Sequence, residues 1–476
     1  MYNNRFLVRH DKTQNFILGF FVIIIGVTCW FQYHSTPMIL PDSNGYLQFS
    51  NTRSLGYPLF LEGIRKTTGF YDSIPAIQLS IWLASLFYLI LGLIQFLRIK
   101  WYGFLAVILI AINVELIKFS FVILTESLAM SLSMLFLGLI LRVLMSKKSI
   151  YLALSSIIVG LAILVKPICW SWFLVLGGLW ISDAVAISRS RKACLLSIPA
   201  ILCIGLMTNL GSKYQSVPAE SAIGESLIGK VGLLAEDTFH SESPRTMQVV
   251  ARFSKPVTDI LDQAPSWQFR YLLSQPYYDQ FRYGDISQKI IQGVQQEEKN
   301  RHLTVEESRK LLALEILKQN AWGYVKDVFL NYLAIWQLWD LKTPAEAKAF
   351  KHWLQQLGHL PWIGSYPEFA RQKPYEDGVW YAWIIRLLWG SIGVLTVIFP
   401  IGVGVRFLRG QPISGQAWYI SLVSILIQVT YLFTVLIQAG LPRYGIIMYP
   451  AMVIVGVCVL DWAGFCLTSK HEKQSC

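Results

Sequence analysis

The sequence predicts an all-α polytopic membrane protein with about ten transmembrane helices and a mainly helical extracytoplasmic loop domain. Three observations predict this fold class: 54% of the 476 residues are hydrophobic, only 15% are charged, and the mean hydropathy is +0.46. Soluble domains carry about 25% charged residues, so this chain has too little polar surface to coat a water-soluble globule. Apolar stretches close to the ~20 residues needed to cross a bilayer recur along it.

The lengths of the apolar runs and their basic flanks place the spans. The first run is a retained span rather than a signal peptide, because no small-residue cleavage site follows Phe16–Trp30. The run 150–166 is short and stops at Lys166–Pro167, which predicts a broken helix of the kind tolerated where backbone lines a protein cavity. The expected spans are 15–32, 77–97, 102–118, 122–145, 150–166, 168–187, 194–211, 379–405, 416–439 and 443–465.

The net charge of +12 does not indicate nucleic-acid binding, because the basic residues lie in short segments between apolar runs. Every second connection carries them, as the positive-inside rule requires of cytoplasmic loops. We therefore expect a multi-pass membrane protein, surrounded by membrane lipids, with both termini in the cytoplasm. The compact loops favour the bacterial plasma (inner) membrane. The basic segments are Arg5–Lys12, Arg98–Lys100, Arg142–Lys148, Arg189–Lys192, Arg406–Arg409 and Lys470–Lys473.

This topology divides the chain into three parts. They are an N-terminal transmembrane module 1–211 that holds the first outer loop 33–76, an extracytoplasmic loop domain 212–378, and C-terminal transmembrane helices 379–476.

Two stretches of the loop domain predict helices. Residues 304–319 have helical periodicity, and Thr304 and Glu307 are spaced as a capping box. The stretch 321–340 is aromatic-rich and contains Lys326 and Asp327. It fits either an amphipathic helix on the membrane surface or a hydrophobic core helix.

Ionisable residues near membrane depth are the functional candidates, because burying an unpaired charge there is expensive. Asp42 follows the first span and is a candidate general base; the alternative is a cap for a helix beginning near Ser43. Lys166 and Arg443 lie where apolar runs break, and a half-buried cation suits a phosphate, although both could simply extend to the interface. Glu126 heads a span, where its charge also complements the helix N-terminus.

The sequence supports neither a divalent metal nor any other certain cofactor. The seven cysteines lack metal-site spacing and mostly lie in or beside apolar runs. The loop histidines His240, His302, His352 and His359 are widely separated. We therefore assign no residue as a metal ligand.

Short motifs in a particular order carry a family resemblance. They are Pro-Asp-Ser-Asn-Gly-Tyr at 41–46, Arg-Ser-Leu-Gly-Tyr-Pro-Leu-Phe-Leu at 53–61, Leu-Thr-Glu-Ser-Leu at 124–128, Leu-Val-Lys-Pro at 164–167 and Pro-Arg-Tyr-Gly-Ile-Ile-Met-Tyr-Pro at 442–450. In their order and sidedness the chain resembles the GT-C superfamily of polytopic glycosyltransferases, which contains the protein O-mannosyltransferases and the aminoarabinose transferases that act on lipid A. The likeness covers the first seven spans and the last one or two, and the long loop is unmatched.

The resemblance implies transfer of a sugar from a polyprenyl-phosphate donor to an acceptor glycan, lipid or protein on the extracytoplasmic face, with inversion at the anomeric carbon. It implies that Asp42 is the general base. Many relatives carry a second acidic residue directly after that Asp, where this chain has Ser43. The resemblance also implies that the donor phosphate is held by Lys166, Arg443, Arg53 and Tyr444, and the substrate by Tyr46, Tyr57 and Glu126.

Two other functions stay open at this point. A transporter or flippase of a lipid-linked sugar would also need buried charges, but such folds often show internal repeats, and no two matching halves are visible here. A lipid-linked oligosaccharide polymerase or ligase would share the donor class and move a whole chain. A single-sugar donor bound near Asp42 would separate it from the transferase.

Overall fold

The computed structural model describes residues 12–32, 36–40, 42–50, 53–111, 113–182, 187–211, 213–214, 223–264, 266–282, 284–297, 304–336, 352, 379–437 and 445–474. Within these ranges the secondary structure is helical, apart from one isolated parallel bridge between Met38 and Val122. The chain forms two compact units. The bundle unit comprises Met1–Ala219, Ile392–Thr430 and Ile446–Cys476, and the loop unit comprises Glu220–Ser391 and Tyr431–Gly445.

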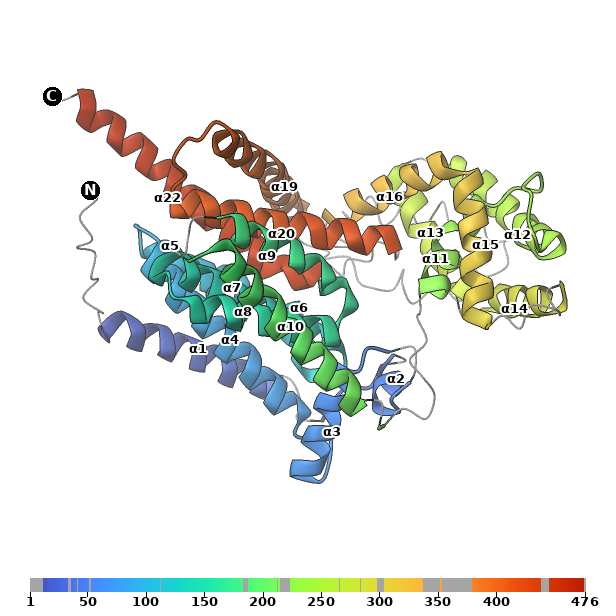
Figure 1. Cartoon of the computed structure of the whole chain (residues 1–476), viewed down its shortest axis with the longest axis horizontal. Coiled ribbons are helices and arrows are strands. Elements are labelled where there is room, and N and C mark those ends of the chain that lie inside the picture. The colour runs from blue at the N-terminus through green and yellow to red at the C-terminus, as the bar shows by residue number, and fades with distance from the viewer. Residues whose placement is uncertain are drawn as a thin grey trace. The chain divides into compact units, whose positions relative to one another are not determined.

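A row of long apolar helices forms the core of the bundle unit. In chain order, each packs against the next (Figure 1): α1 (Lys12–Gln32), α4 (Ile74–Phe96), α7 (Thr125–Ser146), α8 (Ser149–Val165) and α10 (Arg189–Gly211). Gly160 lets α8 approach α10 closely, because a Cβ there would lie 3.0 Å from the carbonyl oxygen of Ala200. Small residues allow this kind of backbone approach between membrane helices.

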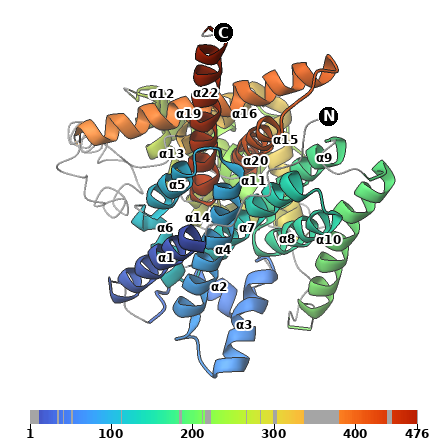
Figure 2. The same cartoon turned by 90° about the vertical axis from the view of Figure 1, so that its left-hand side faces the viewer.

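Shorter helices extend this row. In the first outer loop, α2 (Ser43–Leu47) and α3 (Gly56–Thr68) lie together beyond the end of α4 (Figure 2). The remaining elements of this part of the chain are α5 (Trp101–Ala111), α6 (Val114–Lys118), η1 (Phe119–Phe121), η2 (Pro167–Trp172) and α9 (Phe173–Ile181).

The C-terminal part of the chain supplies three long helices. They are α19 (Val379–Leu408), α20 (Gly415–Ile437) and α22 (Tyr449–Gln474), and the short η5 (Ile446–Met448) precedes α22. Asp461 of α22 is 1% exposed. Its carboxylate accepts the backbone N–H groups of Arg98 and Ile99 and the side-chain amide of Gln416. This buried acid therefore joins the middle of α22 to the segment after α4 and to the start of α20.

Among the residues that the structure describes, six helices are long and apolar enough to cross a membrane: Ile74–Phe96, Thr125–Ser146, Arg189–Gly211, Leu387–Leu408, Gly415–Ile437 and Ile446–Gly464. Two of them present large apolar side chains outward. Ile201 and Leu206 of α10 are 61% and 65% exposed, and Ile401 of α19 is 61% exposed. Such surfaces are unfavourable in water, so these helices are consistent with an integral membrane protein.

The predicted number of ten spans is not confirmed. The expected span 102–118 is divided, and its first helix α5 has 11 residues. A helix of that length is about 16 Å long and cannot cross a hydrocarbon core of about 30 Å. The expected span 150–166 corresponds to α8, whose 17 residues are at the lower limit. Hydropathy alone does not separate such helices from buried ones.

The loop unit is a cluster of helices with its own apolar core. Val250, Phe281, Ile290 and Ile316 are fully buried in that core. The helices are α11 (Ile223–Val231), α12 (Pro244–Asp262), α13 (Trp267–Arg282), α14 (Asp285–Glu297), α15 (Val305–Gln319) and α16 (Ala321–Trp336), with the short η3 (Gly232–Leu234) after α11.

The capping box predicted in this unit is confirmed. The Thr304 side chain accepts the backbone N–H of Glu307, and the Glu307 side chain accepts the backbone N–H of Thr304. The helix predicted at 304–319 therefore begins where the sequence pattern places it. The stretch predicted at 321–340 is helical to Trp336, and 337–340 lies outside the described residues.

Candidate functional site

Hydrogen bonds fix the first outer loop to the segment before α7. The N–H of Met38 donates to the Phe121 carbonyl at 2.8 Å, and the N–H of Ile123 donates to the Met38 carbonyl at 3.1 Å. The buried hydroxyl of Ser43 accepts the N–H of Leu40 and donates to the Ile123 carbonyl at 2.8 Å. These bonds set the position of α2, which begins at Ser43.

A second set of contacts fixes the later part of the loop to the end of α8. The Ser54 hydroxyl donates to the Val165 carbonyl at 2.7 Å. Gly56 packs directly on α8, because a Cβ there would come within 2.7 Å of the Leu164 carbonyl carbon. The loop therefore lies against the start of α7 and the end of α8 at once.

Asp42 and Arg53 form an ion pair within this loop. Arg53 Nη2 lies 2.7 Å from Asp42 Oδ1, and the two side chains are 28% and 31% exposed. Asp42 occupies the N-cap position of α2, but its side chain makes no capping hydrogen bond. The carboxylate thus faces an arginine and remains accessible from outside. The Asp42 side chain therefore does not cap α2 by a hydrogen bond.

Lys166 and Glu126 form the second ion pair. Their Nζ–Oε1 distance is 3.0 Å, and the side chains are 12% and 5% exposed. The predicted break at Lys166 is confirmed: α8 ends at Val165, and Lys166 is extended, with φ −146° and ψ 110°. A residue before proline avoids the helical region, and the extended backbone turns Lys166 toward the first turn of α7, where Glu126 lies.

Tyr46 is close enough to both ion pairs to be affected by their charges. The Arg53 guanidinium lies over its ring, 5.1 Å from the centroid. Burial raises the pKa of the Tyr46 hydroxyl above its ordinary value, and the negative charge of Glu126 raises it further, whereas Arg53 and Lys166 act in the opposite direction. Both pairs are therefore within electrostatic range of one phenol, and that phenol keeps its proton at neutral pH.

Tyr57 completes the aromatic part of the site. Its ring meets the Tyr46 ring edge to face at a centroid distance of 5.2 Å. Burial raises the pKa of the Tyr57 hydroxyl well above its ordinary value, with Glu126 adding to the effect. The sequence-predicted residues Asp42, Arg53, Tyr46, Tyr57, Glu126 and Lys166 thus form one cluster.

Gln78 supports this cluster and was missed by the sequence analysis. Its side chain is almost fully buried in α4. The amide oxygen accepts the Tyr57 hydroxyl at 3.1 Å, and the amide nitrogen donates to the carbonyls of Ser120 and Val122. A lone amide near the start of the apolar run 77–97 was the available signal, because polar side chains in such runs usually have a partner.

Some of the predicted residues are not part of the described cluster. Arg443 and Tyr444 lie outside the described residues, so their assignment to the donor phosphate stays a prediction. Another acid of the first outer loop, Glu62, forms a two-point ion pair with Arg65 on α3 and is also outside the cluster.

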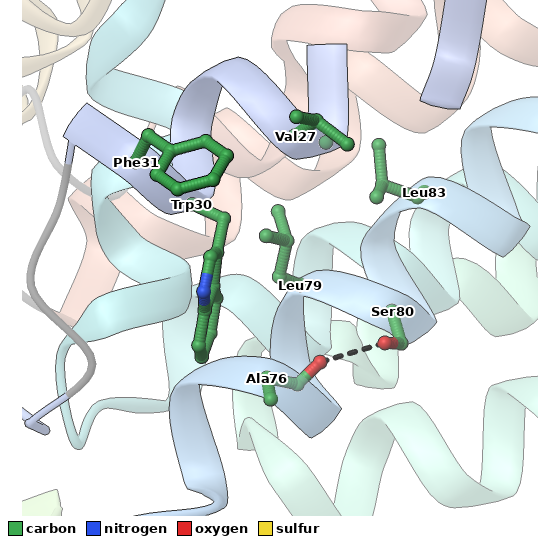
Figure 3. A pocket seen from close by; sticks show the side chains of 8 residues that line it. Val27, Trp30, Phe31, Ala76, Leu79, Ser80 and Leu83 are labelled. Atoms are coloured by element: carbon green, nitrogen blue, oxygen red, sulfur yellow. Dashed lines mark hydrogen bonds between the residues drawn. The ribbon is translucent and has the colours of Figure 1, made fainter. Parts of the chain in front are cut away.

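An open apolar groove runs between α1 and α4 (Figure 3). It has a volume of about 260 Å³, and α1 lines it with Gly26, Val27, Trp30 and Phe31. The other wall is α4, with Ala76, Leu79, Ser80 and Leu83. Because α1 leads into the first outer loop and α4 follows it, the groove extends from the loop along the two helices. Its lining suits a hydrocarbon chain.

No grouping of three or more His, Cys, Asp or Glu side chains that could hold a metal ion occurs within the described ranges. No protein-family model, curated protein or solved structure matches this chain. The fold and the cluster define a helical protein with candidate membrane spans and paired charges in its first loop. A functional proposal therefore rests on the geometry of that loop.

Proposed function

We propose that this chain is a glycosyltransferase of the GT-C type that moves a sugar from a polyprenyl-phosphate donor to an acceptor at the extracytoplasmic face of the membrane. The observation that carries the proposal is the cluster in which the accessible Asp42 carboxylate lies beside Arg53 and Tyr46, next to the Glu126–Lys166 pair. A carboxylate and cations within one site fit proton removal at one atom and charge stabilisation at another.

The proposed step is a direct displacement. The Asp42 carboxylate accepts a proton from the acceptor hydroxyl or amine while that group attacks the anomeric carbon. The bond between this carbon and the phosphate oxygen breaks, and the polyprenyl phosphate leaves with its electron pair. Cations at the site stabilise the charge that develops on the leaving phosphate; Arg53 and Lys166 are the candidates within the described residues, with Arg443 and Tyr444 as further predicted contacts.

The groove between α1 and α4 supports a lipid-linked donor. It is apolar and open, and it begins at the first outer loop, where Trp30 and Ala76 line it (Figure 3). A polyprenyl chain in this groove would be held by van der Waals packing along its length, while its phosphate head would lie at the level of the first outer loop. This arrangement matches the amphipathic form of the proposed donor.

A transfer assay tests the proposal. The intact protein is reconstituted in liposomes and supplied with a panel of synthetic polyprenyl-phosphate sugars and with membrane extract as the acceptor source, and release of polyprenyl phosphate is measured. We expect release from one class of donor. Asp42→Asn removes the base and should lower release at least a hundredfold, within the range that general base catalysis contributes, about 10²–10⁴-fold.

Asp72→Asn is the matched control, since Asp72 is an exposed acid of the same loop. It should keep the wild-type rate. Full activity of a folded Asp42→Asn variant would remove the base assignment. Absence of release from every donor in the panel, with the wild-type protein folded, would overturn the proposed activity.

A further inference from the structure

Helix α16 (Ala321–Trp336) turns one face into the loop unit. On that face Asn331 is buried, and the Asp327 carboxylate accepts the Tyr278 hydroxyl at 2.6 Å. Asp327 also forms an ion pair with the buried Lys230 at 3.0 Å. These contacts fix the rotation of α16 about its own axis, so its opposite face has a defined direction.

The opposite face carries an exposed apolar stripe. Trp322, Val325 and Phe329 are 68%, 50% and 59% exposed. Their spacing of three and four residues places them on one side of the helix. Lys326 lies beside the stripe, with its ammonium nitrogen 5.7 Å from the centre of the Trp322 ring. Three large apolar side chains in one row form an exposed apolar surface, which is unfavourable in water.

α16 is also held to the end of a candidate membrane span. The Tyr324 hydroxyl donates to the Leu436 carbonyl at 2.5 Å, and the Trp336 ring meets the Tyr431 ring at a centroid distance of 5.0 Å. Tyr431 and Leu436 lie in the last turns of α20, which is one of the six candidate spans, and these turns belong to the loop unit. These contacts therefore hold α16 beside the end of α20.

We propose that α16 is an interfacial helix, whose stripe of Trp322, Val325 and Phe329 inserts into the lipid headgroup and acyl boundary of the leaflet at which α20 ends. Aromatic side chains favour this region, and an amphipathic helix lies there with its apolar side toward the acyl chains. Lys326 would extend its ammonium group toward the headgroups while its methylene stem stays beside Trp322. In this proposal the lipid bilayer covers the apolar stripe.

The proposal reconciles the two alternatives for 321–340. The face with Asn331 and Asp327 packs as a core helix does, and the face with Trp322 and Phe329 is that of a surface helix. It does not depend on the chemistry proposed for the first outer loop, because it concerns different residues. The consequence is that the loop unit is attached to the membrane surface by a rigid helix.

Spin-label accessibility tests the inference in the intact chain reconstituted in phosphatidylcholine liposomes. A nitroxide is attached through a ketone-bearing amino acid at position 325, so that the seven native cysteines need no change. The matched control is the same label at Lys289, an exposed position on α14 of the same unit. Collisions with oxygen, which concentrates in lipid, are compared with collisions with a water-soluble nickel chelate.

We expect oxygen to collide more often than nickel at position 325 and the reverse at position 289. Water-like accessibility at position 325, equal to that at 289, would overturn the inference. Protection of position 325 from both reagents would overturn it as well, because it would show that protein rather than lipid covers the stripe.

Discussion

Arg53 Nη2 donates to Asp42 Oδ1 at 2.7 Å, and the same guanidinium lies over the ring of Tyr46. The two residues are eleven positions apart, so the loop folds back on itself to join them. The ion pair orients a partly exposed carboxylate, for which the sequence also allowed a helix-capping role. Orientation of this kind is what a general base needs before its substrate arrives.

The first prediction concerns that orientation. Arg53→Gln removes the ion pair, and transfer should fall about a hundredfold, since small misplacements of a reacting group can cost that much. Arg65→Gln is the control, because Arg65 pairs with Glu62 in the same loop but is about half exposed; its transfer rate should stay at the wild-type value. The measurement is polyprenyl phosphate release in liposomes. Equal losses in the two variants would argue against a positioning role for Arg53.

The second prediction concerns Ser43, the residue directly after Asp42. Here the hydroxyl is fully buried and bonded to Leu40 and Ile123. Ser43→Ala should lower the free energy of unfolding by about 1–3 kcal/mol, because it leaves a buried backbone group without its partner. Ser43→Asp should destabilise more, because a buried carboxylate would face the Ile123 carbonyl.

Asn44→Asp is the matched control for that series, since Asn44 is exposed and adjacent in sequence. It should leave the thermal unfolding midpoint of the detergent-solubilised protein nearly unchanged. A Ser43→Asp variant as stable as the wild type would mean that this position accepts a carboxylate, and that burial and hydrogen bonding do not require a hydroxyl at Ser43.

The third prediction concerns the buried pair of Glu126 and Lys166. Glu126→Gln leaves the lysine charge without its carboxylate, and breaking a buried pair in this way costs about 3–5 kcal/mol. Lys166→Met should cost a similar amount. The double variant should be more stable than the sum of the single losses predicts, because no isolated charge remains.

Binding of polyprenyl phosphate to the double variant then tests whether the pair binds the donor lipid in addition to stabilising the fold. A folded double variant that no longer retains this lipid in native mass spectrometry would support the assignment of Lys166 to the donor phosphate. Unchanged lipid binding would show that the pair serves stability alone. If the double variant lost as much stability as the two single variants together, Glu126 and Lys166 would not be coupled.

Local sequence signals predicted the parts of the structure that local physics decides. The capping box at Thr304 and Glu307 and the helix break at Lys166–Pro167 both depend on residues a few positions apart, and both are confirmed. The six candidate spans follow from composition in the same way. Where a run was short, as for α5 and α8, hydropathy could not separate a crossing helix from a buried one.

Contacts between residues far apart in the sequence could not be predicted from such local signals. Glu126 and Lys166 are 40 positions apart, and Ser43 and Ile123 are 80 apart. Glu126, Lys166 and Ser43 were visible as polar residues near apolar runs, but their partners were not, because pairing depends on how the loop folds over α7 and α8. Gln78 was missed for the same reason: its three hydrogen bonds join segments that meet only in the folded chain.

The last prediction concerns the start of α15, where Thr304 and Glu307 form the capping box. The hydrogen bonds from Thr304 lower the pKa of the Glu307 carboxyl below its ordinary value, since they favour the charged form. A carboxyl whose pKa is depressed in the folded state adds stability above its unfolded pKa of about 4.3, and this stability is lost as the pH falls through the lowered value.

Protection of the first turn of α15 against hydrogen exchange should therefore weaken below about pH 4. Thr304→Val removes the side-chain hydrogen bonds but keeps the backbone N–H that donates to Glu307, so it should weaken protection at neutral pH and only reduce its pH dependence. Hydrogen exchange followed by mass spectrometry in the intact protein, corrected for the intrinsic exchange rate at each pH, measures both effects, and the exposed Lys318 in the last turn of α15 supplies a Lys318→Gln control that should leave the first turn unchanged. If the Thr304→Val variant kept the wild-type pH profile, the Thr304 hydroxyl would not contribute to the depressed pKa of Glu307.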